Sequence, residues 1–203
     1  MKLTENQTAI VVGSVLGDGF LQKTGIKNAR LRLEHASKQK EYLLWKGRHM
    51  PRLFQGSPSH LERVHPKNGA NYSYVRWQST ASPELGRWRD YFYPNGKKIV
   101  PADIGSMLSP LALAVWYMDD GYYSKDKASF LYLGRVTRIE AETLQDAIAK
   151  NFGIVSKVYD KKVKGFALYF PVVETRKLHQ LVKTFVHPSM KYKLGESSTS
   201  LTP

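Results

Sequence analysis

The sequence predicts an α+β fold of two pseudo-symmetric halves, each with the element order αββαββα. One apolar run of helical length ends at Asp18-Gly19, and a second ends 102 positions later at Asp120-Gly121. The same succession of strand and helix signals follows each run, and 203 residues suit two fused units of about 100 residues. We expect the halves to pack through the two apolar helices, with an N-terminal half over 1–96, a connecting segment over 97–108, a C-terminal half over 109–194 and a disordered tail over 195–203.

Helix caps and alternating side chains define the N-terminal half. Thr4 and Gln7 form a capping box at the start of the first apolar helix. Residues 29–36 alternate apolar and charged side chains, which predicts a strand with one apolar and one charged face. Ser82-Pro83 is an N-cap followed by proline at the first helical position. The expected elements are a helix that opens at Thr4 and ends at 17–19, strands 20–27 and 29–36, helix 37–54, strands 60–65 and 72–79 around a loop at 66–69, and helix 83–92.

The same signals recur in the C-terminal half. Ser109-Pro110 caps the second apolar helix, and Thr137 with Glu140 forms another capping box. The segment before this half, from Lys97 to Met107, is expected to be extended. The expected elements are the apolar helix from 109 to its Asp-Gly end, strands 121–127 and 129–135, helix 137–152, strands 154–161 and 166–170, and helix 174–185.

The charge balance indicates a polyanionic partner. Lys plus Arg total 31 against 17 Asp plus Glu, which gives a formal net charge of +14. Nucleic acid and anionic membranes both attract such a chain. The apolar run 111–118, however, is far short of the ~20 residues that a membrane-spanning helix requires, so we expect no membrane partner. The absence of cysteine excludes disulfides and thiolate metal sites and favours an intracellular protein, in a prokaryotic cytoplasm or nucleoid or in an organelle matrix.

Each Asp-Gly pair combines an ordinary helix stop with an unfavourable charge. Glycine ends helices because it enters the left-handed conformation without steric cost. A carboxylate in the last turn faces the negative end of the helix dipole, which costs roughly 0.3–1 kcal/mol when exposed. We therefore interpret Asp18 and Asp120 as residues kept for chemistry. Small residues such as Gly13 and Ala114 permit close parallel packing, which would bring both carboxylates together near a pseudo-twofold axis.

A divalent-metal site is the chemistry expected of two adjacent acids. Their carboxylates repel each other, and a bound cation removes that penalty. Oxygen ligands with no His or Cys nearby favour Mg²⁺ over zinc, and Mn²⁺ or Ca²⁺ can occupy the same site. Metal-bridged carboxylates activate water and stabilise the leaving oxygen in phosphodiester hydrolysis. The backbone carbonyls of Gly17 and Asp119 are expected to complete the metal shell, whereas the histidines show no metal-ligand spacing: His35, His49, His60, His65, His179 and His187.

A basic strand face is expected in each half, so that two antiparallel sheets form a curved saddle in the major groove of DNA. Arg, Lys and Gln carry the donors that read guanine and adenine edges, while many of the lysines would neutralise phosphates. The residues expected to bind DNA are Lys23, Lys27, Arg30, Arg32, Arg76 and Gln78 in the N-terminal half, and Lys125, Lys127, Arg135, Lys157, Lys161, Lys162 and Lys164 in the C-terminal half.

At the two Asp-Gly motifs the chain resembles the LAGLIDADG homing endonucleases. A chain with two copies of the motif would be a single-chain, pseudo-twofold member of that family. The first copy has Ser14 and Leu16 where the namesake pattern has Leu and Asp. The matching positions are Leu113, Ala114, Asp120 and Gly121 in the second copy, and Gly13, Asp18 and Gly19 in the first.

The resemblance implies further site residues. Residues 97–101 and 190–194 look like the segments that supply an active-site lysine in single-chain members, which maps the role onto Lys98 and Lys193. These lysines would stabilise the phosphate charge or polarise the attacking water. Glu34 matches a polar position that lines a hydrated pocket on the DNA-binding face. Its counterpart in the C-terminal half is expected near residues 134–135.

The activity that the resemblance implies is site-specific cleavage of double-stranded DNA. The enzyme would act as a monomer with Mg²⁺ on a long, near-asymmetric target, leave a staggered break, and be encoded in a mobile intron or intein. Two alternatives stay open: an RNA maturase with intron RNA as its partner, and a non-catalytic DNA-binding regulator. Both acids and both lysines favour an enzyme over a regulator, which needs none of them. A maturase can keep the acids, so the sequence leaves that role open.

Overall fold

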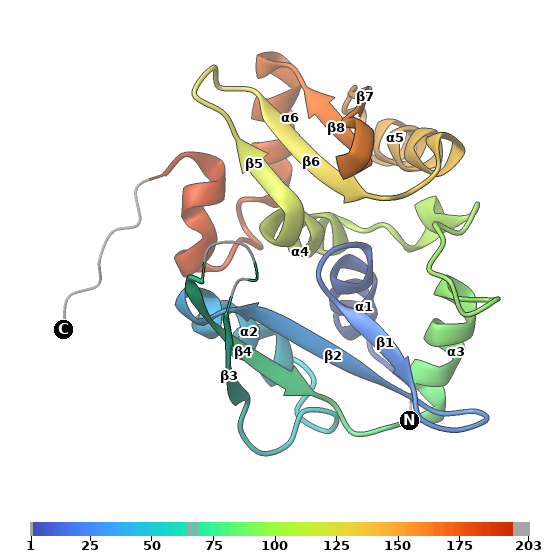
Figure 1. Cartoon of the computed structure of the whole chain (residues 1–203). Helices are drawn as coiled ribbons and strands as arrows, with labels where there is room; N and C mark the ends of the chain where they lie inside the picture. The colour runs from blue at the N-terminus through green and yellow to red at the C-terminus, as the bar shows by residue number, and fades with distance from the viewer. Residues whose placement is uncertain (1, 65, 67–68, 197–203) are drawn as a thin grey trace.

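The computed structural model describes residues 2–64, 66 and 69–196, and its element order repeats once along the chain. Figure 1 shows α1 and α4 side by side in the middle, with one sheet on either side of them. The N-terminal half contains α1 (Glu5–Leu16), β1 (Phe20–Lys23), β2 (Ala29–Ala36), α2 (Lys40–Arg48), β3 (Ser59–Val64), β4 (Asn71–Gln78) and α3 (Pro83–Phe92). The C-terminal half contains α4 (Pro110–Asp120), β5 (Gly121–Tyr123), β6 (Ser129–Gly134), α5 (Arg138–Phe152), β7 (Lys157–Asp160), β8 (Phe166–Phe170) and α6 (Val172–Val182).

The two sheets have the same topology. Their strand orders are β1-β2-β4-β3 and β5-β6-β8-β7, and every pair is antiparallel. Helices α2 and α3 pack against the first sheet, and α5 and α6 against the second. The predicted α+β fold of two αββαββα halves is therefore confirmed.

The predicted helix caps are present with the expected hydrogen bonds. Thr4 and Thr137 each form a full capping box, and Ser82 and Ser109 each accept a bond from the backbone N–H three residues on. An N-cap of this kind satisfies backbone donors that would otherwise lack a partner and stabilises a helix by about 1 kcal/mol. The starts of four helices are thus set by local sequence.

Helices α1 and α4 form the interface between the halves. Every residue from Ala9 to Leu16 in α1 is buried, as is every residue from Ala112 to Asp119 in α4. A Cβ at Gly13 would overlap the Ala112 carbonyl oxygen, and one at Gly17 would lie 2.6 Å from the Cβ of Asp119. Because these contacts advance in the same direction along both helices, the helices run parallel and their C-terminal ends meet.

The motif glycines serve close packing rather than left-handed turns. Gly121 has a φ of −72°, and Gly19 is not among the glycines with positive φ, so the expected left-handed helix stop is wrong at both Asp-Gly pairs. A Cβ at Gly121 would overlap the Tyr117 carbonyl oxygen, and a Cβ at Gly19 would lie 2.7 Å from the carbonyl oxygen of Ser14. Glycine is required here because other atoms occupy the space of a side chain.

Several elements differ in length from the prediction. The helix expected over 37–54 is a 3₁₀ turn over 37–39 followed by α2, because residues after α2 turn while Met50, Leu53 and Phe54 stay buried. An apolar pattern can continue through a turn, so spacing alone overestimates a helix. The connecting segment contains a 3₁₀ helix, Ile104–Met107, instead of being extended throughout.

Part of the prediction lies outside the described residues, namely His65, positions 67–68 of the expected loop and positions 197–203 of the expected tail. Among the residues that the structure describes, no helix is both long enough and apolar enough to cross a membrane.

Candidate active site and nucleic-acid interface

The two predicted catalytic acids lie where the motif helices end. Asp120 is the last residue of α4, whereas Asp18 follows the end of α1 by two residues, so it is not in the last helical turn as expected. Burial, together with the carboxylates of Asp18 and Asp119, raises the pKa of Asp120 to about 8. Burial and the Asp119 carboxylate raise the pKa of Asp18 to about 6, although 48% of its side chain is accessible. Burial is thus the main reason that both carboxyl groups hold their protons more tightly than usual, and the neighbouring lysines only partly oppose it.

Asp119 is a third acid in this cluster, and its side chain is held in a buried ion pair. Its Oδ1 and Oδ2 accept bonds from Lys46 Nζ at 2.8 and 2.9 Å, and Oδ1 accepts a bond from the Tyr42 hydroxyl at 2.9 Å. Oδ2 lies 3.3 Å from the backbone N–H of Asp18. The Asp119 and Lys46 side chains are both fully buried. This carboxylate therefore ties α2, α4 and the residue after α1 together.

His35 lies between Asp18 and Asp119, which corrects the expectation that no histidine is near the acids. Its Nδ1 is 3.7 Å from Asp18 Oδ2, and its Nε2 is 3.9 Å from Asp119 Oδ1. Burial and the Lys46 ammonium lower the pKa of His35 to about 3, so the imidazole is neutral at pH 7. Asp18, His35 and Asp119 place one potential ligand atom each within 4.8 Å of one another. The donor set near Asp18 is thus mixed oxygen and nitrogen.

The two predicted lysines bind backbone carbonyls at the ends of the motif helices. Lys98 Nζ donates to the Leu16 carbonyl at 3.3 Å. Lys193 Nζ donates to the carbonyls of Asp119 at 3.1 Å and Gly121 at 2.8 Å. Lys98 of the connecting segment therefore reaches the end of α1, and Lys193 reaches the end of α4. The Asp119 carbonyl, which was expected to be a metal ligand, already accepts a bond from Lys193.

A cleft lies beside each acid. The cleft next to Asp120 includes Lys98 and Arg135, so a predicted lysine and a predicted DNA-binding arginine face the same carboxyl group. The cleft next to Asp18 is lined by side chains of the first sheet: Phe20, Arg32, Glu34, His35, Arg63, Tyr74 and Arg76.

The outer face of the first sheet is polar, as predicted. Arg32 pairs with Gln78 across β2 and β4, and Glu34 pairs with Arg76. Glu34 accepts bonds from Arg76 and Arg63 at 2.7 Å. Burial alone would raise the pKa of Glu34, but the hydrogen bonds and charges of the two arginines together outweigh burial and lower it. Arg30 donates to Gln78 at 3.2 Å. The guanidinium groups are thus held in fixed positions on the sheet. Lys23 ends β1, and Lys27 lies in the turn that follows it.

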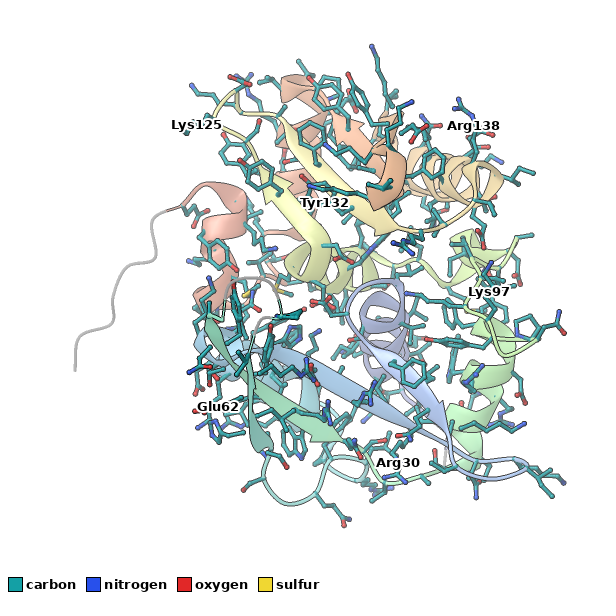
Figure 2. All side chains as sticks on the ribbon, in the orientation of Figure 1. Arg30, Glu62, Lys97, Lys125, Tyr132 and Arg138 are labelled. Atoms are coloured by element: carbon teal, nitrogen blue, oxygen red, sulfur yellow. The ribbon has the colours of Figure 1, made fainter. Side chains whose placement is uncertain are left out.

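The predicted basic residues of the C-terminal half do not alternate along strands. Of that set only Lys157 lies within a strand, β7. The others lie in connections: Lys125 and Lys127 between β5 and β6, Arg135 after β6, and Lys161, Lys162 and Lys164 between β7 and β8. The outer face of the sheet itself carries aromatic side chains, and Figure 2 labels Tyr132 on β6 and Lys125 at the turn before it.

Strand pairing also places the counterpart of Glu34. Gly121 pairs with Leu131, and extending the register of β1 and β2 by one residue pairs Gly19 with Leu33. Leu33 and Leu131 are therefore equivalent, and Glu34 is equivalent to Tyr132. The expected counterpart near 134–135 is wrong by register, because the β5–β6 hairpin, counted from Gly121, is two residue pairs shorter than the β1–β2 hairpin counted from Gly19.

Sequence reasoning missed Tyr42 and Lys46 as parts of the site. Both lie on the buried face of α2, four residues apart, which places them one turn apart on one side of a helix. A lysine at the buried position of an amphipathic helix requires an acidic partner. That spacing was the available signal, although nothing in it identifies Asp119 as the partner.

Comparisons with known proteins agree with this arrangement. The model of the LAGLIDADG DNA endonuclease family matches residues 8–178. Protein RecA of Mycobacterium shimoidei is 33% identical over 95% of this chain, and this chain spans 47% of that protein, about half its length. Cytochrome b mRNA maturase bI2 of Debaryomyces hansenii is 29% identical over 95% of this chain and 75% of that protein. DNA endonuclease I-ChuI of Chlamydomonas applanata is 25% identical, with 98% of both chains covered.

Among solved structures, the homing endonuclease I-WcaI bound to its DNA recognition sequence matches with a TM-score of 0.88. Its sequence is 26% identical, and the match covers 96% of this chain and 88% of that chain.

Proposed function

Because the chain belongs to the LAGLIDADG DNA endonuclease family, we propose that it is a site-specific endonuclease that cleaves both strands of a DNA duplex. One observation carries the proposal. Two carboxylates from equivalent positions of two halves meet at the ends of parallel helices, with a lysine beside each helix end. One acid and one lysine for each strand is the arrangement that a staggered double-strand break requires. The two halves in one chain support action as a monomer.

Asp18 and Asp120 would hold the divalent metal, for which we propose Mg²⁺. Their raised pKa values support this assignment, because burial and neighbouring carboxylates make both groups retain protons, and a bound cation would favour their charged forms. When bound, the metal would supply Lewis-acid stabilisation of the phosphate oxygens and of the attacking water. The buried Asp119 carboxylate is neutralised by Lys46, so we assign it a positioning role rather than that of a ligand.

Lys98 and Lys193 would stabilise charge on the scissile phosphates. Each ammonium is fixed by backbone carbonyls and has donors left over, since a lysine offers three and accepts none. A compact positive charge held in place lowers the energy of a transition state in which negative charge grows on oxygen.

The polar face of the first sheet and the lysine-bearing connections of the second would hold the duplex. Arg32, Arg76 and Gln78 have donors suited to purine edges, and the connection lysines are suited to phosphates. The net charge of +14 supports a polyanionic partner of this kind.

A selection from random duplex DNA tests the proposed function. The protein is incubated with a randomised duplex library and Mg²⁺, and the cut ends are sequenced. We expect a single long target with cuts offset on the two strands, and no cut ends when EDTA replaces Mg²⁺. Recovery of no enriched target, or cutting that persists in EDTA, would contradict the proposal.

A second candidate is RNA maturation, which the similarity to the Debaryomyces hansenii maturase favours. It requires binding to structured RNA and needs no catalytic acids. A splicing assay with an intron RNA that the protein binds separates the two: acceleration that survives Asp18→Asn together with Asp120→Asn would support a maturase.

A further inference from the structure

The two sheets carry different chemistry at equivalent positions of their outer faces. The register makes Arg32 equivalent to Phe130 and Glu34 equivalent to Tyr132. Across the neighbouring strand, Arg32 pairs with Gln78, whereas Phe130 pairs with Tyr169. A guanidinium and an amide in the first sheet thus correspond to two aromatic rings in the second.

The next row of the sheets repeats the contrast. Glu34 pairs with Arg76 in the first sheet, whereas Tyr132 pairs with Ala167 in the second. On the edge strand β7, Tyr159 pairs with Ala167. The charged pair of this row is therefore replaced by a methyl group and two rings, whose hydroxyls are their only hydrogen-bonding groups.

These rings form one contiguous cluster. Phe130 lies 5.1 Å from Tyr169, 6.3 Å from Tyr159 and 6.4 Å from Tyr132, measured between ring centroids. Tyr159 and Tyr169 are 5.4 Å apart. Tyr132 and Tyr159 remain 39% and 46% exposed, so the cluster is presented to solvent rather than buried in the core. We call these four residues the aromatic face.

Positive charge borders the aromatic face. Lys161 Nζ lies 5.5 Å from the centre of the Phe130 ring and 5.7 Å from that of Tyr132. Lys157 pairs with Tyr169 at the neighbouring edge. Aromatic rings with an ammonium over two of them fit a ligand that has apolar groups on its bases and an anionic backbone.

We propose that the C-terminal half recognises its half of the DNA target mainly through thymine methyl groups, whereas the N-terminal half reads purine edges through hydrogen bonds. This inference rests on the proposed endonuclease function and adds to it the kind of base that each half selects. In the major groove the thymine C5-methyl is the apolar group that a side chain can contact, while guanine and adenine present acceptors for Arg and Gln. Ring faces offer no donors to purine acceptors, but they pack well against methyl groups.

Base analogues in the selected target test the inference. Deoxyuridine in place of thymidine removes the methyl group alone, and 7-deazaguanine removes the N7 acceptor alone. Each analogue is placed in one half-site at a time, and binding is measured with Ca²⁺ in place of Mg²⁺. We expect deoxyuridine to weaken binding by about fourfold for each buried methyl in one half-site and to have little effect in the other. The half-site that tolerates deoxyuridine should be the one that is sensitive to 7-deazaguanine.

Variants assign the half-sites to the protein halves. Tyr132→Ser and Tyr159→Ser each remove a partly exposed ring, so folding should survive, and a thermal melt checks it. Either variant should abolish much of the deoxyuridine effect without changing the 7-deazaguanine effect. Arg76→Ala serves as the matched control: it should abolish much of the 7-deazaguanine effect without changing the deoxyuridine effect.

The outcomes separate this inference from the proposed function. A target that is bound and cut but is indifferent to deoxyuridine in both half-sites would overturn the inference alone, as would a deoxyuridine effect that the tyrosine variants leave intact. Tighter binding of unpaired RNA than of the cut duplex, lost in Tyr132→Ser, would also overturn it, because the rings would then be stacking on bases. If no duplex is bound or cut, the proposed function itself fails.

Discussion

At the end of α1 the chain has Gly17, and at the equivalent place at the end of α4 it has Asp119. The Asp119 side chain occupies the space that a side chain at Gly17 would need, since a Cβ there would lie 2.7 Å from Asp119 Oδ2. From that position the carboxylate reaches Lys46 and Tyr42 of the N-terminal half. Near the pseudo-twofold axis there is room for one such acid.

The comparison teaches that equal topology does not imply equal chemistry. The halves share their strand order and the position of one acid and one lysine. They differ in the third carboxylate, in His35 and in the composition of the outer sheet faces. Residues near a symmetry axis contact their own equivalents. A large side chain at one of two equivalent positions therefore requires a small residue at the other. The following predictions test which of these features are equivalent and which are not.

The largest effect is expected from the acids, which we treat as equivalent. Asp18→Asn or Asp120→Asn should abolish double-strand cleavage while leaving DNA affinity near that of the unmodified protein, because the amide keeps the shape but loses the charge that holds the metal. Strand-resolved cleavage and a binding titration measure the two properties. Asp126→Asn, in the exposed turn between β5 and β6, is the control. Normal cutting of both strands by either active-site variant would break the equivalence.

A large loss of stability is expected where the halves differ. Lys46→Met leaves the buried Asp119 carboxylate without its cation, and removing one partner of a buried pair typically costs about 3–5 kcal/mol. Urea unfolding measures the loss. Asp119→Leu in the same chain should recover much of it, since it removes the unpaired charge. Lys38→Met, at an exposed position, should change the free energy of unfolding by no more than about 0.5 kcal/mol. An equal effect of both lysine variants would disprove the buried ion pair.

Variants of Lys98 and Lys193 should affect the cleavage rates of the two DNA strands unequally. Lys98→Met or Lys193→Met removes one charge that we propose stabilises the transition state, and such a loss typically slows a reaction about 10²–10³-fold. Because Lys98 binds the end of α1 and Lys193 binds the end of α4, we expect each variant to slow one strand more than the other and to accumulate nicked duplex. Cleavage of end-labelled DNA shows which strand is affected. Slowing of the same strand in both variants would contradict the assignment of one lysine to each half.

The last difference is expected in the pH dependence of the metal-free protein. The pKa of Asp120 is about 8 in the folded state against an ordinary value of 3.8, so the folded protein binds this proton more tightly than the unfolded chain does. Folding stability should therefore fall as the pH rises from about 4 towards 8, because the unfolded chain releases the proton first. Asp120→Asn should flatten this part of the profile and make the protein more stable at pH 8. Urea unfolding in EDTA at pH 5 and pH 8 measures the difference in stability. An equal difference in the Asp120→Asn variant and the unmodified protein would contradict a raised pKa of Asp120.

Local sequence was enough to predict most elements and their order. Capping boxes at Thr4 and Thr137, the Pro-containing caps and the strand alternation act over a few residues, so their physics does not depend on the rest of the chain. The repeated Asp-Gly motif likewise identified the two acids, and the fold that it implied is confirmed. Element ends were less predictable, since the apolar residues after α2 continue the helical spacing through a turn.

Tertiary structure decided what the site is made of. Lys46 and Asp119 are 73 positions apart, and His35 meets Asp18 only because β2 passes beside the end of α1. The sequence supplies many lysines in the second half, but it does not show where its strands end. Because β5, β6 and β7 end at Tyr123, Gly134 and Asp160, most of these lysines lie in connections, and the face of the sheet carries aromatic rings. Sequence determines which side chains are available and the local shape of the chain around them. Which of them meet is decided by long-range packing, because a buried charge or ring has no favourable place until its partner arrives from elsewhere in the fold.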